Sequence, residues 1–278
     1  MIKMIFSDFD NTMLDYYSED NYFDDYKLGI LSRLKEKGIK FCIVTGRSVP
    51  FFEQFPGLLD VVDYIAGSNG GCIYDVKNGN YIYQSIVDED VFSKIIAYTR
   101  ANDGGFLLNN KGKRFKYGEW KATDCLEYTG YEECTFEQII LSFNKDKIQE
   151  VLKYLEQFKS ISVSNIDYLD DLCVIDVNNK DVSKGNAAAF LVDYLGVDIA
   201  DVMAFGDGVN DRSLFEVINK GVAVGNAVEQ LKTLSKEVTL SCHDNGIYKY
   251  MEEHNLPYVT LKDGEYLDDN FKYDRQTK

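Results

Sequence analysis

The 278-residue sequence has few of the residues that build several common kinds of site. It contains only two histidines, His243 and His254, and this argues against a tetrahedral zinc site built on histidine. Its six cysteines form no Cys-x-x-Cys pair, and Cys42, Cys72 and Cys173 lie in apolar stretches. We therefore expect small buried thiols in a reducing compartment.

Basic residues are also scarce, with 30 lysines and arginines against 46 aspartates and glutamates and a formal net charge of -16. A nucleic-acid or anionic membrane partner calls for a basic face, so neither partner is expected. A small phosphorylated ligand remains compatible with this charge, because a bound cation can reverse the field locally.

Long apolar runs are absent, and none approaches the roughly 20 residues of a membrane-spanning helix. The apolar run near the N-terminus is interrupted by Asp8 and Asp10, which argues against a signal peptide. We expect a cytoplasmic protein, as a monomer or weak homodimer. A hydrophobic content of 45% over this length allows one large domain or two modest ones.

Residues 4–14, MIFSDFDNTML, open with β-forming apolar residues and lead into two carboxylates. A strand followed by a turn would place Asp8 and Asp10 at the carboxyl end of a sheet, where open α/β folds bind ligands. Their i, i+2 spacing points both side chains to one face of an extended chain. Asn11 would then break the strand, since asparagine tolerates positive φ better than most residues. Taken alone, the stretch fits an ordinary acidic strand exit equally well.

Three further stretches place polar groups in comparable positions. The apolar strand FCIV is followed by TGR, and the apolar strand VMAF is followed by GDGVND. A helix opens with SKG. The polar side chains at these positions are Thr45, Arg47, Lys184, Asp207, Asn210 and Asp211.

In their order along the chain, the four motifs resemble those of the haloacid dehalogenase superfamily of phosphohydrolases, and their spacing resembles its Cof-type branch. The resemblance covers nearly the whole chain, to about His254. Asn11 departs from the family, which usually has glycine there. The resemblance implies an α/β fold, with a Rossmann-like doubly wound parallel-sheet core and an inserted α+β cap domain.

Hydrophobic periodicity predicts where the two domains divide. We expect residues 1–77 and 181–255 to form the core, because a turn-rich break at 75–80 precedes a change of pattern. Residues 78–180 would form the cap, with helices at 89–100 and after Asn144. Residues 256–278 would be a polar C-terminal tail. The strands expected in the cap are 106–108, 114–117, 138–143, 160–163 and 172–177.

The resemblance also implies catalytic roles. Asp8 would be the nucleophile that forms an aspartyl-phosphate, and Asp10 the general acid and base. Thr45 and Lys184 would hold the phosphoryl oxygens, and the helix start already favours anions near Lys184. A lysine without a function is disfavoured at this position by the helix dipole.

The same resemblance implies a Mg²⁺ ion, since a cation must offset the charge of a carboxylate attacking a phosphate dianion. Asp8, Asp207 and the backbone carbonyl of Asp10 would bind the ion. Asp211 would support it without ligating it directly, or through a water molecule. The alternative for Asp207 and Asp211 is a helix-capping turn.

Other side chains near these positions are candidates for contacting substrate. Asn210 would contact phosphate or orient Lys184. Arg47 and Asn69 would lie near the substrate, although a structural role fits each equally well.

A basic island at residues 111–121, KGKRFKYGEWK, holds the only tryptophan. Strand alternation would place Lys113, Phe115 and Tyr117 on one face, and Arg114 and Lys116 on the other. The ordinary interpretation is a solvated strand face with one aromatic side packed inward. The functional interpretation is that Arg114 and Lys116 face the catalytic pocket and contact the part of the substrate beyond its phosphate.

The sequence therefore predicts a Mg²⁺-dependent phosphatase that acts on a small phosphorylated metabolite: a sugar phosphate, a nucleotide or a cofactor phosphate. A phosphotransferase such as a sugar phosphomutase would share these motifs, and release of inorganic phosphate distinguishes the two. A non-enzymatic metal-binding or phosphate-binding regulator is a further alternative, which the retention of Asp8, Asp10 and Lys184 disfavours.

Overall fold

The computed structural model describes residues 1–15, 22–118, 120, 125–130, 135–169 and 171–256. It also gives the backbone of two short strands, β15 (Val259–Thr260) and β16 (Tyr266–Leu267), which pair with each other. The rest of the expected C-terminal tail lies outside the described residues. Among the helices described, none combines the length and apolar character needed to cross a membrane.

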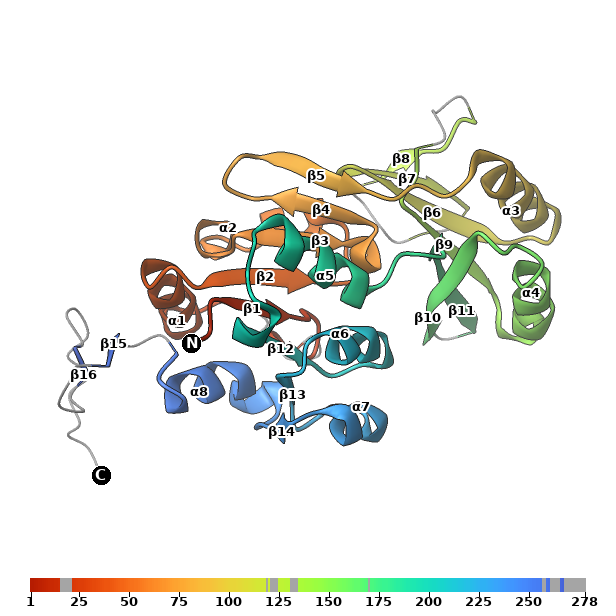
Figure 1. Ribbon diagram of the computed structural model, residues 1–278. Coiled ribbons are helices and arrows are strands. Elements are labelled where there is room, and N and C mark those ends of the chain that lie inside the picture. The colour runs from red at the N-terminus through yellow and green to blue at the C-terminus, as the bar shows by residue number, and fades with distance from the viewer. Residues whose placement is uncertain are drawn as a thin grey trace.

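The larger of two main sheets has eight strands in the order β14-β13-β12-β1-β2-β3-β4-β5 (Figure 1). The strands from β14 to β3 are parallel, and β4 and β5 are antiparallel additions at one edge. The central strands are buried on both faces, as their continuous apolar runs require. The bounds are β1 (Met4–Ser7), β2 (Lys40–Val44), β3 (Tyr64–Gly67), β4 (Cys72–Asp75), β5 (Asn80–Gln84), β12 (Val202–Gly206), β13 (Gly221–Ala223) and β14 (Glu237–Val238).

Strand order reverses between the neighbouring strands β1 and β12, because β1 to β3 run one way across the sheet and β12 to β14 the other. Right-handed crossovers then put the connecting helices on opposite faces. This confirms the predicted doubly wound fold class, and a crevice forms at the carboxyl ends of strands where such a reversal occurs. The helices that cover the two faces of the larger sheet are α1 (Asp25–Glu36), α2 (Leu58–Val61), α5 (Lys184–Tyr194), α6 (Arg212–Val217), α7 (Glu229–Leu234) and α8 (Gly246–Glu253).

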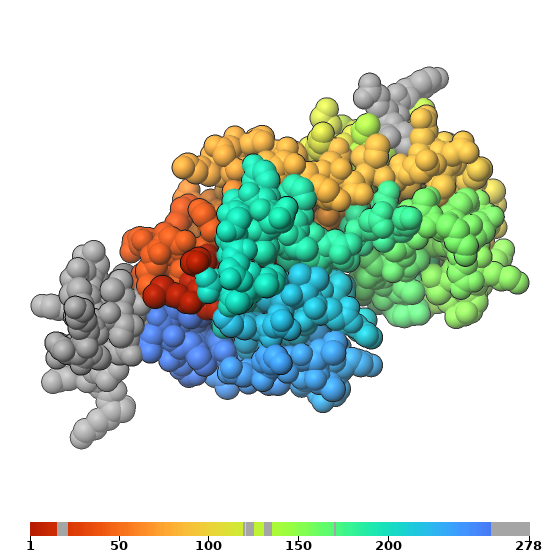
Figure 2. Space-filling model, viewed as in Figure 1, coloured from red at the N-terminus to blue at the C-terminus, as the bar shows by residue number. Residues whose placement is uncertain are grey.

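An inserted unit lies between β5 and α5, and has a six-stranded sheet of order β10-β11-β9-β6-β7-β8 with its own hydrophobic cluster. It occupies one end of the molecule, beside the core (Figures 1 and 2). As alternation predicts, Phe115 and Tyr117 pack in this cluster, while Arg114 and Lys116 lie on the other face, which we call the open face. The elements are α3 (Glu89–Ala101), β6 (Gly105–Asn110), β7 (Lys113–Tyr117), β8 (Leu126–Glu127), β9 (Gln138–Asn144), α4 (Ile148–Leu155), β10 (Ile161–Leu169) and β11 (Leu172–Asn179).

Two local expectations need correction. The expected boundary after residue 77 is too early, because β5 pairs with β4 and the chain leaves the core sheet only after Gln84. The turn-rich stretch is a hairpin, in which the carboxylate of Asp75 accepts hydrogen bonds from Asn78, and it is not a linker. Asn144 precedes a 3₁₀ turn and its side chain caps nothing, so α4 begins only at Ile148.

Candidate active site

Asp8 directly follows β1, and its backbone N–H donates to the carbonyl of Phe205 on β12, 3.0 Å away. The carboxylate therefore lies where the strand order reverses, and the residue is only 7% exposed. Asn11 turns the chain with φ 57°, as predicted, and its N–H bonds the carbonyl of Leu14 at 2.7 Å. The sharp turn fixes the residues from Asp8 to Leu14 against the sheet edge.

Lys184 is almost fully buried, although it is the first residue of α5. Ser183 caps the helix, because its hydroxyl accepts from the N–H of Asn186 at 3.0 Å. The Lys184 Nζ lies 2.6 Å from Oδ1 of Asp8 and 2.6 Å from Oδ1 of Asp211. Burial opposes the ammonium charge, but the two carboxylates outweigh burial and raise the pKa of Lys184.

The loop after β12 is organised around the Asp211 side chain. Its Oδ2 accepts from the N–H groups of Asp207 at 3.0 Å and Gly208 at 2.9 Å. The carboxylate packs on Gly206, where a Cβ would lie 2.6 Å from Asp211 Cγ, so glycine is required there. Asp211 thus braces this loop and anchors Lys184 at the same time.

Asp8, Asp207 and Asp211 bring carboxylate oxygens within 4.8 Å of one another. Thr12 supports this group, since its hydroxyl donates to Asp207 Oδ1 at 3.1 Å. Burial raises the pKa of Asp8 and of Asp207, and the neighbouring carboxylates raise both further. A single ammonium, that of Lys184, faces the three carboxyl groups. A divalent cation suits such an all-oxygen donor set, because its charge would offset the repulsion between the carboxylates.

Asp10 lies apart from that group, and its carboxylate is held by Arg47. The guanidinium donates from Nε at 3.0 Å and from Nη2 at 2.8 Å, in a two-pronged pair. The same guanidinium lies 4.4 Å from the ring centre of Phe51. Thr45 is fully buried, and its hydroxyl accepts from the backbone N–H of Arg47 at 3.1 Å. The loop from Asp8 to Asp10 therefore joins the carboxylate group around Asp8 to the Asp10–Arg47 pair.

Asn69 joins the core to the inserted unit. It has a left-handed backbone with φ 58°, and its Nδ2 donates to Asp176 Oδ2 and to Ser164 Oγ, each at 3.1 Å. Its Oδ1 accepts from Asn210 Nδ2 at 3.3 Å. Among the described hydrogen bonds, Lys184 Nζ donates to Asp8 and Asp211, whereas the Asn210 amide donates to Asn69.

Asp176 is a residue that the sequence interpretation missed. It lies on β11, where burial raises its pKa to about 7, and it faces Asn69 across the junction. The sequence feature that could have pointed to Asp176 is its position as the one carboxylate in the apolar run LCVIDV. Alternation along β11 puts it on the face opposite the buried Ile175 and Val177.

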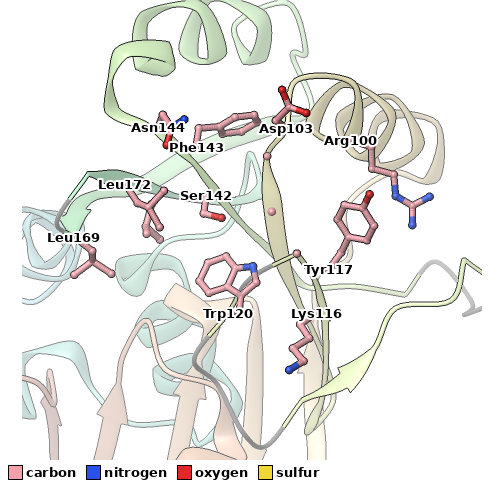
Figure 3. Close-up of a pocket in the computed structure, with 14 residues that line it drawn as sticks. Arg100, Asp103, Lys116, Tyr117, Trp120, Ser142, Phe143, Asn144, Leu169 and Leu172 are labelled. Carbon is pink, nitrogen blue, oxygen red and sulfur yellow. The ribbon is translucent and has the colours of Figure 1, made fainter.

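Arg114 and Lys116 are partly buried on the open face of the inserted sheet. Lys116 Nζ lies 3.4 Å from Glu127. Lys116 also lines a cavity of about 980 Å³ together with Tyr117 and Trp120 (Figure 3). A second, smaller cavity of about 270 Å³ borders Lys184, and its lining also includes Asn69, Ser164 and Asn210. The two basic side chains are absent from that smaller lining.

Comparison with known proteins identifies the family to which this chain belongs. The pattern of haloacid dehalogenase-like hydrolases matches residues 5–251. The chain therefore belongs to this family and is a hydrolase of that class, which confirms the family resemblance and the predicted enzyme class.

Individual relatives agree with this assignment. A "Putative phosphatase" of Buchnera aphidicola is 27% identical over 253 residues, covering 84% of this chain and 90% of that protein. A solved phosphatase of the same superfamily from Bacteroides thetaiotaomicron is 23% identical, with a TM-score of 0.77 over 92% of this chain and 96% of that one. A solved sugar phosphatase of subclass IIB is 19% identical, with a TM-score of 0.74 over 91% and 99%. At these identities, the two structures show the shared fold.

Proposed function

We propose that this protein is a Mg²⁺-dependent phosphatase that hydrolyses a small phosphorylated metabolite through an aspartyl-phosphate on Asp8. The observation that carries the proposal is the buried Asp8 carboxylate, bound by Lys184 at 2.6 Å and grouped with Asp207 and Asp211. Relatives named as phosphatases support the choice of a phosphoric monoester as substrate.

The oxygen donors near Asp8 fit a magnesium ion. Asp8 and Asp207 would hold it, with the Asp10 carbonyl as a third donor. Asp211, whose oxygens already accept from Lys184 and from two backbone N–H groups, would support the site from behind. When bound, the ion supplies positive charge that offsets repulsion between the Asp8 carboxylate and the phosphate.

In the first step, an Asp8 oxygen attacks phosphorus, and the bond from phosphorus to the ester oxygen breaks as that oxygen takes a proton from Asp10. In the second step, Asp10 takes a proton from water as the water attacks phosphorus. The bond between phosphorus and Asp8 breaks, its electron pair returns to the carboxylate, and inorganic phosphate leaves. Lys184 and Thr45 would hold the phosphoryl oxygens during both steps.

Arg47 sets a requirement on the first step. Both carboxylate oxygens of Asp10 accept from the Arg47 guanidinium, so neither oxygen is free to contact the ester oxygen of a substrate while that pair persists. We infer that Arg47 leaves Asp10 when substrate binds, and contacts the substrate instead. The flat guanidinium suits a phosphate or sugar oxygen.

The inserted unit would act as a cap that covers the site and contacts the part of the substrate beyond its phosphate. The subclass IIB sugar phosphatase of the same fold makes sugar phosphates the first class to test, ahead of nucleotides and cofactor phosphates. From charge and apolar pattern, we expect a cytoplasmic monomer or weak homodimer without nucleic-acid or membrane partners.

A screen of phosphorylated metabolites with Mg²⁺, measuring release of inorganic phosphate, tests the proposal. Asp8→Asn is nearly isosteric but cannot form the acyl-phosphate, so it should abolish turnover and keep the fold by circular dichroism. Asp193→Asn, at an exposed position on α5, is the matched control and should retain activity. Transfer of the phosphoryl group to a second hydroxyl without phosphate release would indicate a phosphotransferase. Near-normal rates in Asp8→Asn would show that Asp8 is not the nucleophile.

A further inference from the structure

A second group of metal-ligating side chains lies outside the carboxylate site. Asp15, Cys242 and His243 place a carboxylate oxygen, a thiol sulfur and an imidazole nitrogen within 4.8 Å of one another. Asp15 directly follows the loop that carries Asp8, and Cys242 and His243 belong to a 3₁₀ turn just before α8. His243 Nδ1 contacts Asp15 Oδ2 across 228 residues of sequence. The fold therefore assembles three different donor types from two distant segments.

Surrounding hydrogen bonds hold this turn in place. Asn226 Oδ1 accepts from the N–H of Cys242 at 2.8 Å and from the Ser241 hydroxyl at 3.2 Å. The Nδ2 of Asn226 donates to the carbonyl of Asn11 at 2.8 Å. This hydrogen bond connects the turn to residues 8–14, which we call the nucleophile loop. Donors whose backbone is fixed in this way need little rearrangement to bind an ion.

The exposure of the three residues also suits a metal site with an open position. Cys242 is only 5% exposed, Asp15 is partly buried, and the His243 side chain is 58% exposed. An ion could reach the group from the His243 side, and a solvent molecule could complete a tetrahedral set. The scarcity of histidine argues against a zinc site built mainly on histidine, whereas this group uses a single histidine together with a thiol and a carboxylate.

The chemistry of the donors selects the ion. Magnesium prefers oxygen ligands alone, whereas a thiolate and an imidazole favour zinc and similar borderline or soft divalent ions. We propose that Asp15, Cys242 and His243 form a second metal site, specific for zinc-like transition metals, which links the end of the nucleophile loop to the turn before α8. The site is independent of the proposed phosphatase mechanism, because none of its ligands belongs to the oxygen-only group around Asp8.

Cobalt(II) is the probe for this site, because a thiolate ligand gives it a charge-transfer absorption that oxygen ligands cannot produce. The full-length protein, kept reduced and in excess Mg²⁺, should bind one Co²⁺ with this absorption, and Zn²⁺ should displace it. Cys242→Ser should remove the absorption, and His243→Ala should weaken Co²⁺ binding by more than about tenfold. The matched controls are Cys125→Ser and His254→Ala, which should both behave as wild type.

The catalytic variant separates this proposal from the phosphatase mechanism. Asp8→Asn should lose phosphatase activity yet keep the Co²⁺ absorption and Zn²⁺ affinity. Absorption that persists in Cys242→Ser, or unchanged affinity in a folded His243→Ala protein, would overturn the site. Absence of a charge-transfer band in the wild type would overturn it equally.

Discussion

Replacing Lys184 with methionine tests whether its ammonium holds the buried carboxylates of the active site together. The Lys184 Nζ lies 2.6 Å from both Asp8 and Asp211. The side chain of Lys184 is 1% exposed, that of Asp8 is 9% exposed and that of Asp211 is 0% exposed. Removing one partner from a buried ionic group leaves uncompensated charge, which typically costs about 3–5 kcal/mol. Methionine keeps an unbranched chain of similar length, so little of this loss would come from packing.

The loss should also depend on pH. Burial already raises the pKa of Asp8, and without Lys184 the pKa rises further above its value in the unfolded chain. A carboxyl group with a raised folded-state pKa is tolerated at low pH, and it destabilises the fold as pH rises through that pKa. The variant should therefore be least stable relative to wild type near pH 8, and should approach wild type near pH 5.

Urea denaturation followed by circular dichroism, in the presence of a chelator, measures the free energy of unfolding at both pH values. Lys232→Met is the control, because Lys232 pairs with the exposed Glu229 at 2.9 Å near the surface and should change stability little. Adding Mg²⁺ should restore part of the stability of the Lys184 variant. A loss below about 1 kcal/mol, or an equal loss at both pH values, would refute the electrostatic reasoning.

Three further predictions concern the metal, the cap and Asp176. Chelation should stop phosphate release and Mg²⁺ should restore it and raise the melting temperature, because the ion binds only the folded carboxylate group; unchanged turnover in excess chelator would contradict a metal requirement. Arg114→Ala or Lys116→Ala should change the ranking of phosphorylated metabolites by roughly 10- to 100-fold in kcat/KM, with little effect on a minimal aryl phosphate; an equal loss on every substrate would instead indicate a defect in cap folding or closure. Asp176→Asn should stabilise the protein at pH 8 by up to about 4 kcal/mol, because the pKa of Asp176 rises from 3.8 to about 7 and each unit is worth about 1.4 kcal/mol. The gain in stability should vanish near pH 4, where wild-type Asp176 is protonated and no charge is buried. Urea unfolding at the two pH values measures this, and an equal change at both would contradict it.

Local patterns predicted the central strands of the core and the polar residues at their ends, whereas the doubly wound order of the sheet was implied by the family resemblance. Buried parallel strands require continuous apolar runs, so β1, β2 and β12 could be located, and the polar residues that follow them had to lie at one sheet edge. The sequence predicted that Asn11 ends the first strand, and the structure shows a left-handed turn at that residue. Alternation also assigned Arg114 and Lys116 to the open face of β7.

The tertiary structure alone decided which distant side chains meet. Whether β5 belongs to the core or the inserted unit depends on its pairing with β4, since a hairpin turn and a linker have similar composition. Asn69 meets Asp176 only because the inserted sheet rests its open face on the loop after β3. Asp15, Cys242 and His243 converge because α8 packs against α1 and Tyr248 donates to the carbonyl of Met13, and no spacing within either segment encodes that approach. Local patterns determine secondary structure and strand ends, whereas contacts across long loops depend on how whole elements pack.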